Sequence, residues 1–187
     1  VVYPSVPNML KRLLLLAALS LTGIASPHAA SAQANTWTDR SPAMTGLNQN
    51  AYITSLTYGD GRFMASTNYG QVAHSVAGTS HWTVSYPPSS GAPFTRGGAA
   101  YGNGTFVVVK DGGRIWTAPP AVDGSGHLTY TARGANASPA NAAVRAVDLN
   151  SVAFVNGLFV VVPAPQTGGT PYTEILTSPD RITWTSR

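Results

Sequence analysis

Tyr58-Gly59-Asp60-Gly61-Arg62-Phe63 is the stretch that decides the fold, because two later stretches repeat its pattern of aromatic residue, tight turn and Phe-led apolar run. The two further copies are Tyr101-Gly102-Asn103-Gly104-Thr105-Phe106 and Phe154-Val155-Asn156-Gly157-Leu158-Phe159. Asn and Gly accept the positive φ that a two-residue hairpin turn requires. Each copy therefore predicts a β-hairpin, and a repeat of roughly 40–55 residues predicts a radial or stacked β architecture.

Two more strands are expected after each hairpin. A second turn leads into a third strand, and an aromatic residue followed by Thr marks a fourth, at Trp82-Thr83, Tyr130-Thr131 and Trp184-Thr185. Gly, Pro and β-branched residues interrupt every candidate helix after residue 32. We therefore predict an all-β fold, a β-propeller of four-stranded antiparallel blades, with about three blades at residues 50–85, 94–133 and 145–187. The marker aromatics are expected in the core, where replacing Trp82 or Trp184 with Ala costs roughly 3–5 kcal/mol.

The predicted propeller is partial or open. Trp37-Thr38 carries the fourth-strand mark without the three strands before it, so residues 36–40 are interpreted as an orphan outer strand. Three blades are fewer than the roughly four to eight that close a ring. Two explanations stay open: the chain is the N-terminal piece of a larger propeller, or half-propellers self-associate through their open blade faces.

The N-terminal residues have the pattern of a secretory signal peptide. Lys11 and Arg12 precede an apolar run at residues 13–25, and Ala30-Ser31-Ala32 forms a small-residue cleavage site. Residues 1–32 are therefore assigned to the signal peptide and upstream residues, and residues 33–187 to the partial propeller. The expected product begins near Gln33, is secreted or periplasmic, and has no stable membrane span. An uncleaved membrane anchor is the alternative.

Composition argues against several classes of function. Removing Lys11 and Arg12 with the signal lowers the net charge from +4 to +2, and no basic cluster remains that could follow a row of phosphates, so no nucleic acid is expected as a partner. Cys is absent, and His74 and His81 have no acidic or Cys partner at ligand spacing. We expect no metal, no cofactor and no catalytic residue in this chain.

Residues 175–185 resemble the Asp-box of bacterial neuraminidase repeats, with Ser178, Asp180 and Trp184 at the box positions and Arg181 where Gly is usual. The chain is similar to sialidase-like propellers and to photosystem II assembly-factor-like propellers. The resemblance implies a structural role for the box. It also implies that a sialidase would need an Arg cluster, a Tyr nucleophile assisted by a Glu, and an acidic Asp. The chain has no Arg-Ile-Pro motif, and Glu174 is its only Glu, so no glycosidase activity is expected from this chain alone.

Ligand binding fits the sequence better. Loops at one end of a propeller carry function on a rigid scaffold, and the residues leading into the first strands are candidate ligand-binding groups. These residues are Arg96, Arg145, Asp148 and Asn150. Tyr69, Trp116 and Tyr172 could stack on sugar rings, although packing between blades is the stronger interpretation for each.

The expected function is that of an exported, non-catalytic β-propeller module for binding or scaffolding, with a glycan or a protein as ligand. The alternative is the N-terminal fragment of a larger sialidase-like propeller glycoside hydrolase.

Overall fold

The computed structural model describes residues 44–77, 79, 81–88, 97–135, 144, 147–165 and 174–187. All of them belong to one unit of the chain, Arg40–Arg187. The predicted signal peptide and the predicted orphan strand at residues 36–40 lie outside the described residues. Within the described part, no helix is long and apolar enough to cross a membrane.

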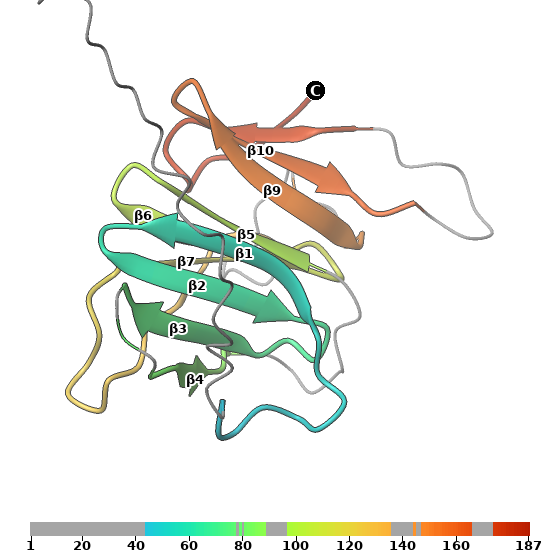
Figure 1. The fold of residues 1–187 in the computed structure, drawn as a ribbon. Coiled ribbons are helices and arrows are strands. Elements are labelled where there is room, and N and C mark those ends of the chain that lie inside the picture. Colours follow the sequence, from blue (N-terminus) through green and yellow to red (C-terminus); the bar gives the residue numbers. More distant parts are fainter. Residues whose placement is uncertain are drawn as a thin grey trace, which may run out of the picture. The chain divides into compact units, whose positions relative to one another are not determined.

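The described residues form three four-stranded antiparallel sheets (Figure 1). Sheet 1 contains β1 (Ile53–Gly59), β2 (Arg62–Thr67), β3 (Val72–Val76) and β4 (Thr83–Ser85). Sheet 2 contains β5 (Gly97–Gly102), β6 (Thr105–Lys110), β7 (Arg114–Ala118) and β8 (Thr131–Ala132). Sheet 3 contains β9 (Leu149–Val155), β10 (Leu158–Pro163), β11 (Leu176–Ser178) and β12 (Thr185–Ser186). Each strand pairs with the next along the chain, which confirms the predicted all-β fold of four-stranded antiparallel units. The sheets are packed together, with β1 beside β5 and β5 beside β9.

The first turn of each sheet adopts the conformation that its sequence predicts. Asp60, Asn103 and Asn156 have φ of 48°, 48° and 49°, and the following glycines also have positive φ. Backbone with positive φ at both central positions matches the twist of the flanking strands. The turn thereby places the aromatic residue of the first strand opposite the Phe of the second, as in the pair of Tyr101 and Phe106.

These facing rings form the same contact in all three sheets. The ring centroids lie 4.8 Å apart for Tyr58 and Phe63, 4.8 Å for Tyr101 and Phe106, and 4.7 Å for Phe154 and Phe159. Tilted pairs at this distance have a favourable ring geometry.

Two of these rings, Tyr101 and Phe154, pack on a glycine of the sheet before their own. A Cβ on Gly59 would lie 2.0 Å from Cγ and Cδ1 of Tyr101, and a Cβ on Gly102 would lie 2.3 Å from Cγ of Phe154. Ordinary carbon contacts are about 3.5–4.0 Å, so only glycine leaves room for the ring. Val155 holds the corresponding position in sheet 3 and is 54% exposed. We call this contact the glycine–ring joint.

Apolar side chains fill the space between the sheets. One core cluster, with Met64, Val72, Phe106 and Val108, lies between sheets 1 and 2. A second cluster, which includes Phe159 among other residues of sheets 2 and 3, lies between those two sheets.

The aromatics before the fourth strands are not equally buried. Trp184 is 3% exposed and belongs to the core between sheets 2 and 3. Trp82 is only partly buried and packs at a smaller cluster on sheet 1 together with Met44 and Leu47. The expectation that Trp82 belongs fully to the core is therefore wrong, and the full cost of truncation to Ala is expected only at Trp184. Both residues directly precede their fourth strand and lie outside it.

Two buried polar side chains add specific contacts to the apolar packing. Lys110 is fully buried, and its Nζ donates a hydrogen bond of 2.7 Å to the backbone carbonyl of Thr67 in sheet 1. His74, which is 1% exposed, accepts a hydrogen bond at Nδ1 from Arg62, and its Nε2 lies 3.2 Å from Oγ of Ser85. Because Arg62 can only donate, the His74 ring is neutral with its proton on Nε2.

Candidate functional site

The sheets present two ends to solvent. β1, β5 and β9 begin at one end, which we call the upstream end, and the turns between the second and third strands lie there as well. The sequence predicts ligand-binding groups at this end. Asp148 and Asn150 are found there, at the start of β9, whereas Arg96 and Arg145 lie outside the described residues.

The carboxylate of Asp148 has a structural contact within the fold. Its Oδ1 accepts a hydrogen bond of 3.1 Å from the backbone N–H of Gly112, in the turn between β6 and β7. Its backbone carbonyl accepts a second bond from Ala164. Asp148 is therefore a link between sheets 2 and 3, and Asn150 beside it is exposed.

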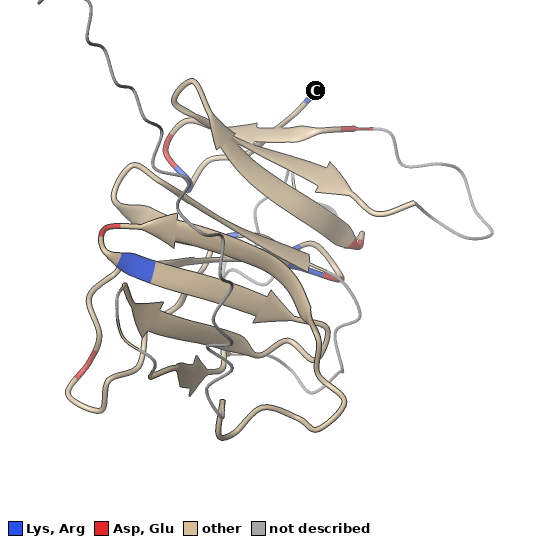
Figure 2. Cartoon of the chain, in the orientation of Figure 1, with Lys and Arg blue, Asp and Glu red and all other residues tan. Residues whose placement is uncertain are grey.

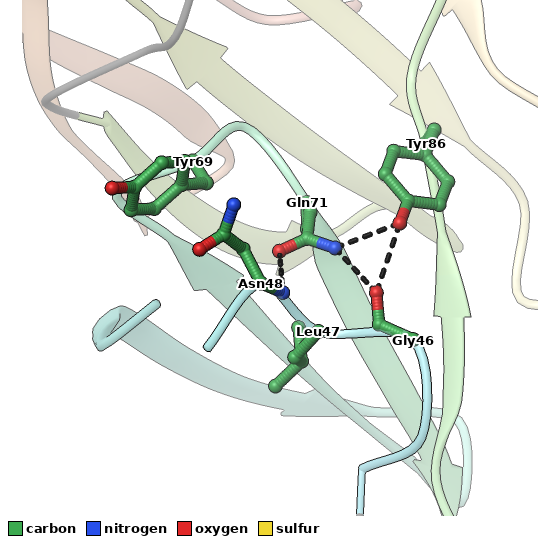
Figure 3. A pocket seen from close by; sticks show the side chains of 6 residues that line it. All are labelled: Gly46, Leu47, Asn48, Tyr69, Gln71 and Tyr86. Carbon is green, nitrogen blue, oxygen red and sulfur yellow. Dashed lines mark hydrogen bonds between the residues drawn. The ribbon is translucent and has the colours of Figure 1, made fainter. Parts of the chain in front are cut away.

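A hollow of about 260 Å³ also lies at the upstream end, on sheet 1 (Figure 3). Three of its residues come from the segment before β1, two from the turn between β2 and β3, and one directly follows β4. They are Gly46, Leu47, Asn48, Tyr69, Gln71 and Tyr86, and we call this hollow the tyrosine pocket. Figure 3 shows Tyr69 and Tyr86 at its two sides, with Gln71 and Asn48 between them.

Gln71 organises the tyrosine pocket. Its side chain is 4% exposed, and its Oε1 accepts a hydrogen bond of 2.9 Å from the backbone N–H of Asn48. Its Nε2 donates to the carbonyl of Gly46 at 2.7 Å and to the hydroxyl of Tyr86 at 2.8 Å. The Tyr86 hydroxyl in turn donates to the same Gly46 carbonyl at 2.9 Å. Because every polar atom of the Gln71 amide has a partner, the segment before β1 is held firmly against β3 and β4.

Charged side chains are absent from this part of the chain. Apart from Asp60 and Arg62, which belong to the hairpin at the opposite end of β1, residues 41–95 contain no Asp, Glu, Lys or Arg. Figure 2 shows the charged positions among the described residues elsewhere on the sheets. The tyrosine pocket therefore offers phenol, amide and aliphatic groups without a formal charge.

The Asp-box residues hold their own turn. Oδ1 of Asp180 accepts hydrogen bonds from the backbone N–H groups of Ile182 and Thr183, at 2.9 and 2.7 Å, and from Oγ of Ser178 at 3.0 Å. Desolvation raises the pKa of Asp180, but these hydrogen bonds outweigh it and lower the pKa to about 2. Arg181 follows with a φ of 61°, which explains why Gly is the usual residue at this position.

The three aromatic candidates for ligand stacking lie in the core, at the tyrosine pocket and outside the described residues. Trp116 is 1% exposed and is a core residue, so it cannot stack on a ligand. Tyr69 lines the tyrosine pocket. Tyr172 lies outside the described residues. In the part of the chain that is described, no group of three or more His, Cys, Asp or Glu side chains is placed to hold a metal ion.

Sequence reasoning missed most of the tyrosine pocket. The sequence indicates Tyr69 as a stacking candidate, whereas it marks neither Gln71 nor Tyr86 as a ligand-binding residue. Two partners of the Gln71 side chain lie 23 and 25 residues earlier in the chain, in a segment that has no strand pattern, and the third, Tyr86, lies 15 residues later. The one available signal is a polar residue, Gln71, directly before the apolar pair Val72-Ala73.

Comparisons with known proteins support the fold alone. No protein-family model matches the sequence, and no curated protein is significantly similar to it. Among solved structures, the fold is similar to Ycf48 from Cyanidioschyzon merolae, with a TM-score of 0.53 and 14% identity over 80% of this chain and 44% of that chain. It is also similar to a structure described as Ycf48 bound to D1 peptide, with a TM-score of 0.52 and 10% identity over 73% of this chain and 40% of that chain.

A weaker similarity, with a TM-score of 0.42 and 15% identity, relates 73% of the chain to 53% of a glutaminyl cyclase from Myxococcus xanthus. The two Ycf48 similarities support a propeller-like, all-β repeat fold, and the chain spans about two fifths of the length of those two chains.

Proposed function

We propose that this chain is an exported, non-catalytic module that binds a ligand outside the cytoplasm. The observation that carries the proposal is the contrast between the acidic side chains and the tyrosine pocket. Acidic groups accept hydrogen bonds from neighbouring turns and strands, whereas the pocket is lined by neutral groups. Such acids are Asp123, Asp148, Asp180 and Glu174.

This contrast argues against hydrolysis. Glycoside hydrolysis needs two carboxyl-type groups on either side of one bond, about 5–10 Å apart. In the described residues, Asp123 accepts from Ser125 and His127 in its own turn, and the carboxylate of Glu174 accepts from Ser186. Carboxylates in such structural roles are poor candidates for a proton-transfer pair.

Export and binding have separate support. The charged, apolar and small-residue order of residues 9–32 supports export. One of the structurally similar chains, Ycf48, is described as bound to a peptide, which is an example of a binding role on a fold of this kind. Fold alone does not assign a function, so the neutral pocket remains the main argument.

Two measurements test the proposal. Purified protein is incubated with a panel of sialosides and neutral glycosides, and no turnover is expected. Turnover that disappears in Asp148→Ala or Glu174→Ala would instead favour the larger propeller hydrolase, whose other catalytic residues would lie elsewhere. The intact mass of the exported product should correspond to a start near Gln33, and a product that retains residues 13–25 would contradict export by signal cleavage.

A further inference from the structure

We propose that the tyrosine pocket binds a neutral sugar ring, with Tyr69 and Tyr86 contacting its apolar faces and the Asn48 side-chain amide donating to a hydroxyl. This inference rests on the proposed binding function and names its ligand class. The geometry that supports it is a hollow of about 260 Å³ with one Tyr at each side and a fixed floor formed by Gln71 (Figure 3).

The aromatic walls suit a ligand with one apolar surface and several hydroxyls. A Tyr ring gives a large contact area at a small cost in side-chain entropy, and it keeps a polar hydroxyl at its edge. Tyr86 is 63% exposed and Tyr69 is half-buried. Both rings therefore have surface available to a ligand, in contrast to the buried Trp116.

The lack of charge selects against ionic ligands. Among the described residues, no Lys, Arg, Asp or Glu lines the pocket. The charged residues nearest to the lining residues along the chain are Arg40, six positions before Gly46, and Arg62, seven positions before Tyr69 in the hairpin at the far end of β1. Recognition of a carboxylate or phosphate usually uses Arg or Lys. A sialylated sugar or a phosphorylated ligand therefore meets no counter-charge on the described lining residues, whereas a neutral hexose requires none.

The backbone around the pocket argues against an extended peptide, which would bind through ladder hydrogen bonds. The carbonyl of Gly46 and the N–H of Asn48 already bond Gln71. The N–H of Tyr69 donates to Oγ1 of Thr67, and the carbonyl of Gln71 accepts from the N–H of Thr67. What remains for a ligand is mainly side-chain chemistry, above all the Asn48 amide nitrogen and the rings of Tyr69 and Tyr86.

The pocket is also preformed. The Gln71 hydrogen bonds fix Gly46, Asn48 and Tyr86 before any ligand arrives. A ligand therefore does not have to order these groups, which lowers the entropy cost of binding. A low entropy cost matters for a sugar. Its hydroxyls give up hydrogen bonds to water when they bind the protein, so the net gain in binding free energy is small.

The test uses the purified full chain on an array of neutral and sialylated oligosaccharides, next to an array of unphosphorylated peptides. A neutral saccharide that binds is then titrated in free form by calorimetry. We expect Tyr69→Ala and Asn48→Ala each to weaken its affinity by about tenfold or more, and Tyr69→Phe to keep most of it. Tyr52→Ala is the matched control, because Tyr52 is as exposed as Tyr86, at 63%, and does not line the pocket; its affinity should stay within about twofold of the wild type. Circular dichroism checks that every variant is folded.

Each other outcome overturns a defined part of the argument. Binding of peptides alone, of sialylated glycans alone, or of nothing on either array contradicts the assignment of a neutral sugar. Neutral-sugar binding that persists in both Tyr69→Ala and Asn48→Ala contradicts the pocket and leaves the binding function in place. Hydrolysis of the bound glycan would overturn the proposed non-catalytic function itself, whatever the pocket variants do.

Discussion

Replacing Gly59 with Ala tests the glycine–ring joint directly. The new Cβ would lie 2.0 Å from two ring carbons of Tyr101, whereas carbon atoms in contact are normally about 3.5–4.0 Å apart. The Tyr101 ring would have to move by about 1.5–2 Å. It cannot move freely, because it packs on Phe106 at a centroid distance of 4.8 Å. Overpacking of this kind typically costs about 1–3 kcal/mol, and we expect a loss near the upper end, about 2–3 kcal/mol.

The assay is urea or thermal unfolding of the purified variant. A loss of this size lowers the melting temperature by roughly 5–10 °C in a protein of this length. Gly124→Ala is the matched control, since its Cβ would meet no atom within 4 Å, and its stability should be unchanged or slightly higher. The double variant Gly59→Ala/Tyr101→Ala should lose about 2 kcal/mol less than the sum of the single losses, because the clash needs both groups. Strictly additive losses, or a Gly59→Ala variant as stable as Gly124→Ala, would refute the joint.

Three further predictions concern a buried base, the Asp-box and the exposed face of sheet 1. Desolvation, with the charges of Arg62 and His127, lowers the pKa of His74 from 6.5 to about 4. The unfolded chain therefore binds the proton first as the pH falls, and the free energy of unfolding should drop by up to about 3 kcal/mol between pH 6.5 and pH 4. His74→Gln should abolish this drop in unfolding curves measured at each pH. Asp180→Ala removes three hydrogen-bond contacts from its turn and should cost about 1–2 kcal/mol in urea unfolding, whereas an unchanged midpoint would show that the box does not stabilise the fold. Leu56 and Tyr58 are 60% and 54% exposed on β1, so the wild type should self-associate in sedimentation experiments, and a Leu56→Thr/Tyr58→Ser variant should self-associate less. A monodisperse wild-type monomer would contradict this prediction.

Local sequence predicted the hairpins well because their determinants are local. Asn103 and Gly104 favour positive φ in any context, and the ring of Tyr101 then faces Phe106 only five residues later. The same stretch did not predict that the Tyr101 ring packs on Gly59, because this contact joins residues of different sheets and depends on how the sheets pack.

The candidate site was harder to predict for the same physical reason. Tyr69 could be named because an aromatic residue in a turn is visible in the sequence. Gln71 could not, because an amide becomes an organising group only when its partners surround it, and these partners lie in the irregular segment before β1 and directly after β4. The role of Asp148 was likewise set by the turn of another sheet, at Gly112.

The glycine–ring joint also determines how this architecture can be lengthened. The ring always belongs to the later sheet and the glycine to the earlier one, so the contact has a direction along the chain. Sheets 1 and 2 each carry a ring followed by a glycine, but among the described sheets only sheet 2 uses both in a joint, because the Tyr101 ring lies on Gly59 and Gly102 receives the Phe154 ring. A tandem duplication of sheet 2 would therefore place each new ring over a glycine and keep both existing joints intact. A unit appended after sheet 3 would meet the side chain of Val155 instead, so that duplication would first require Val155→Gly.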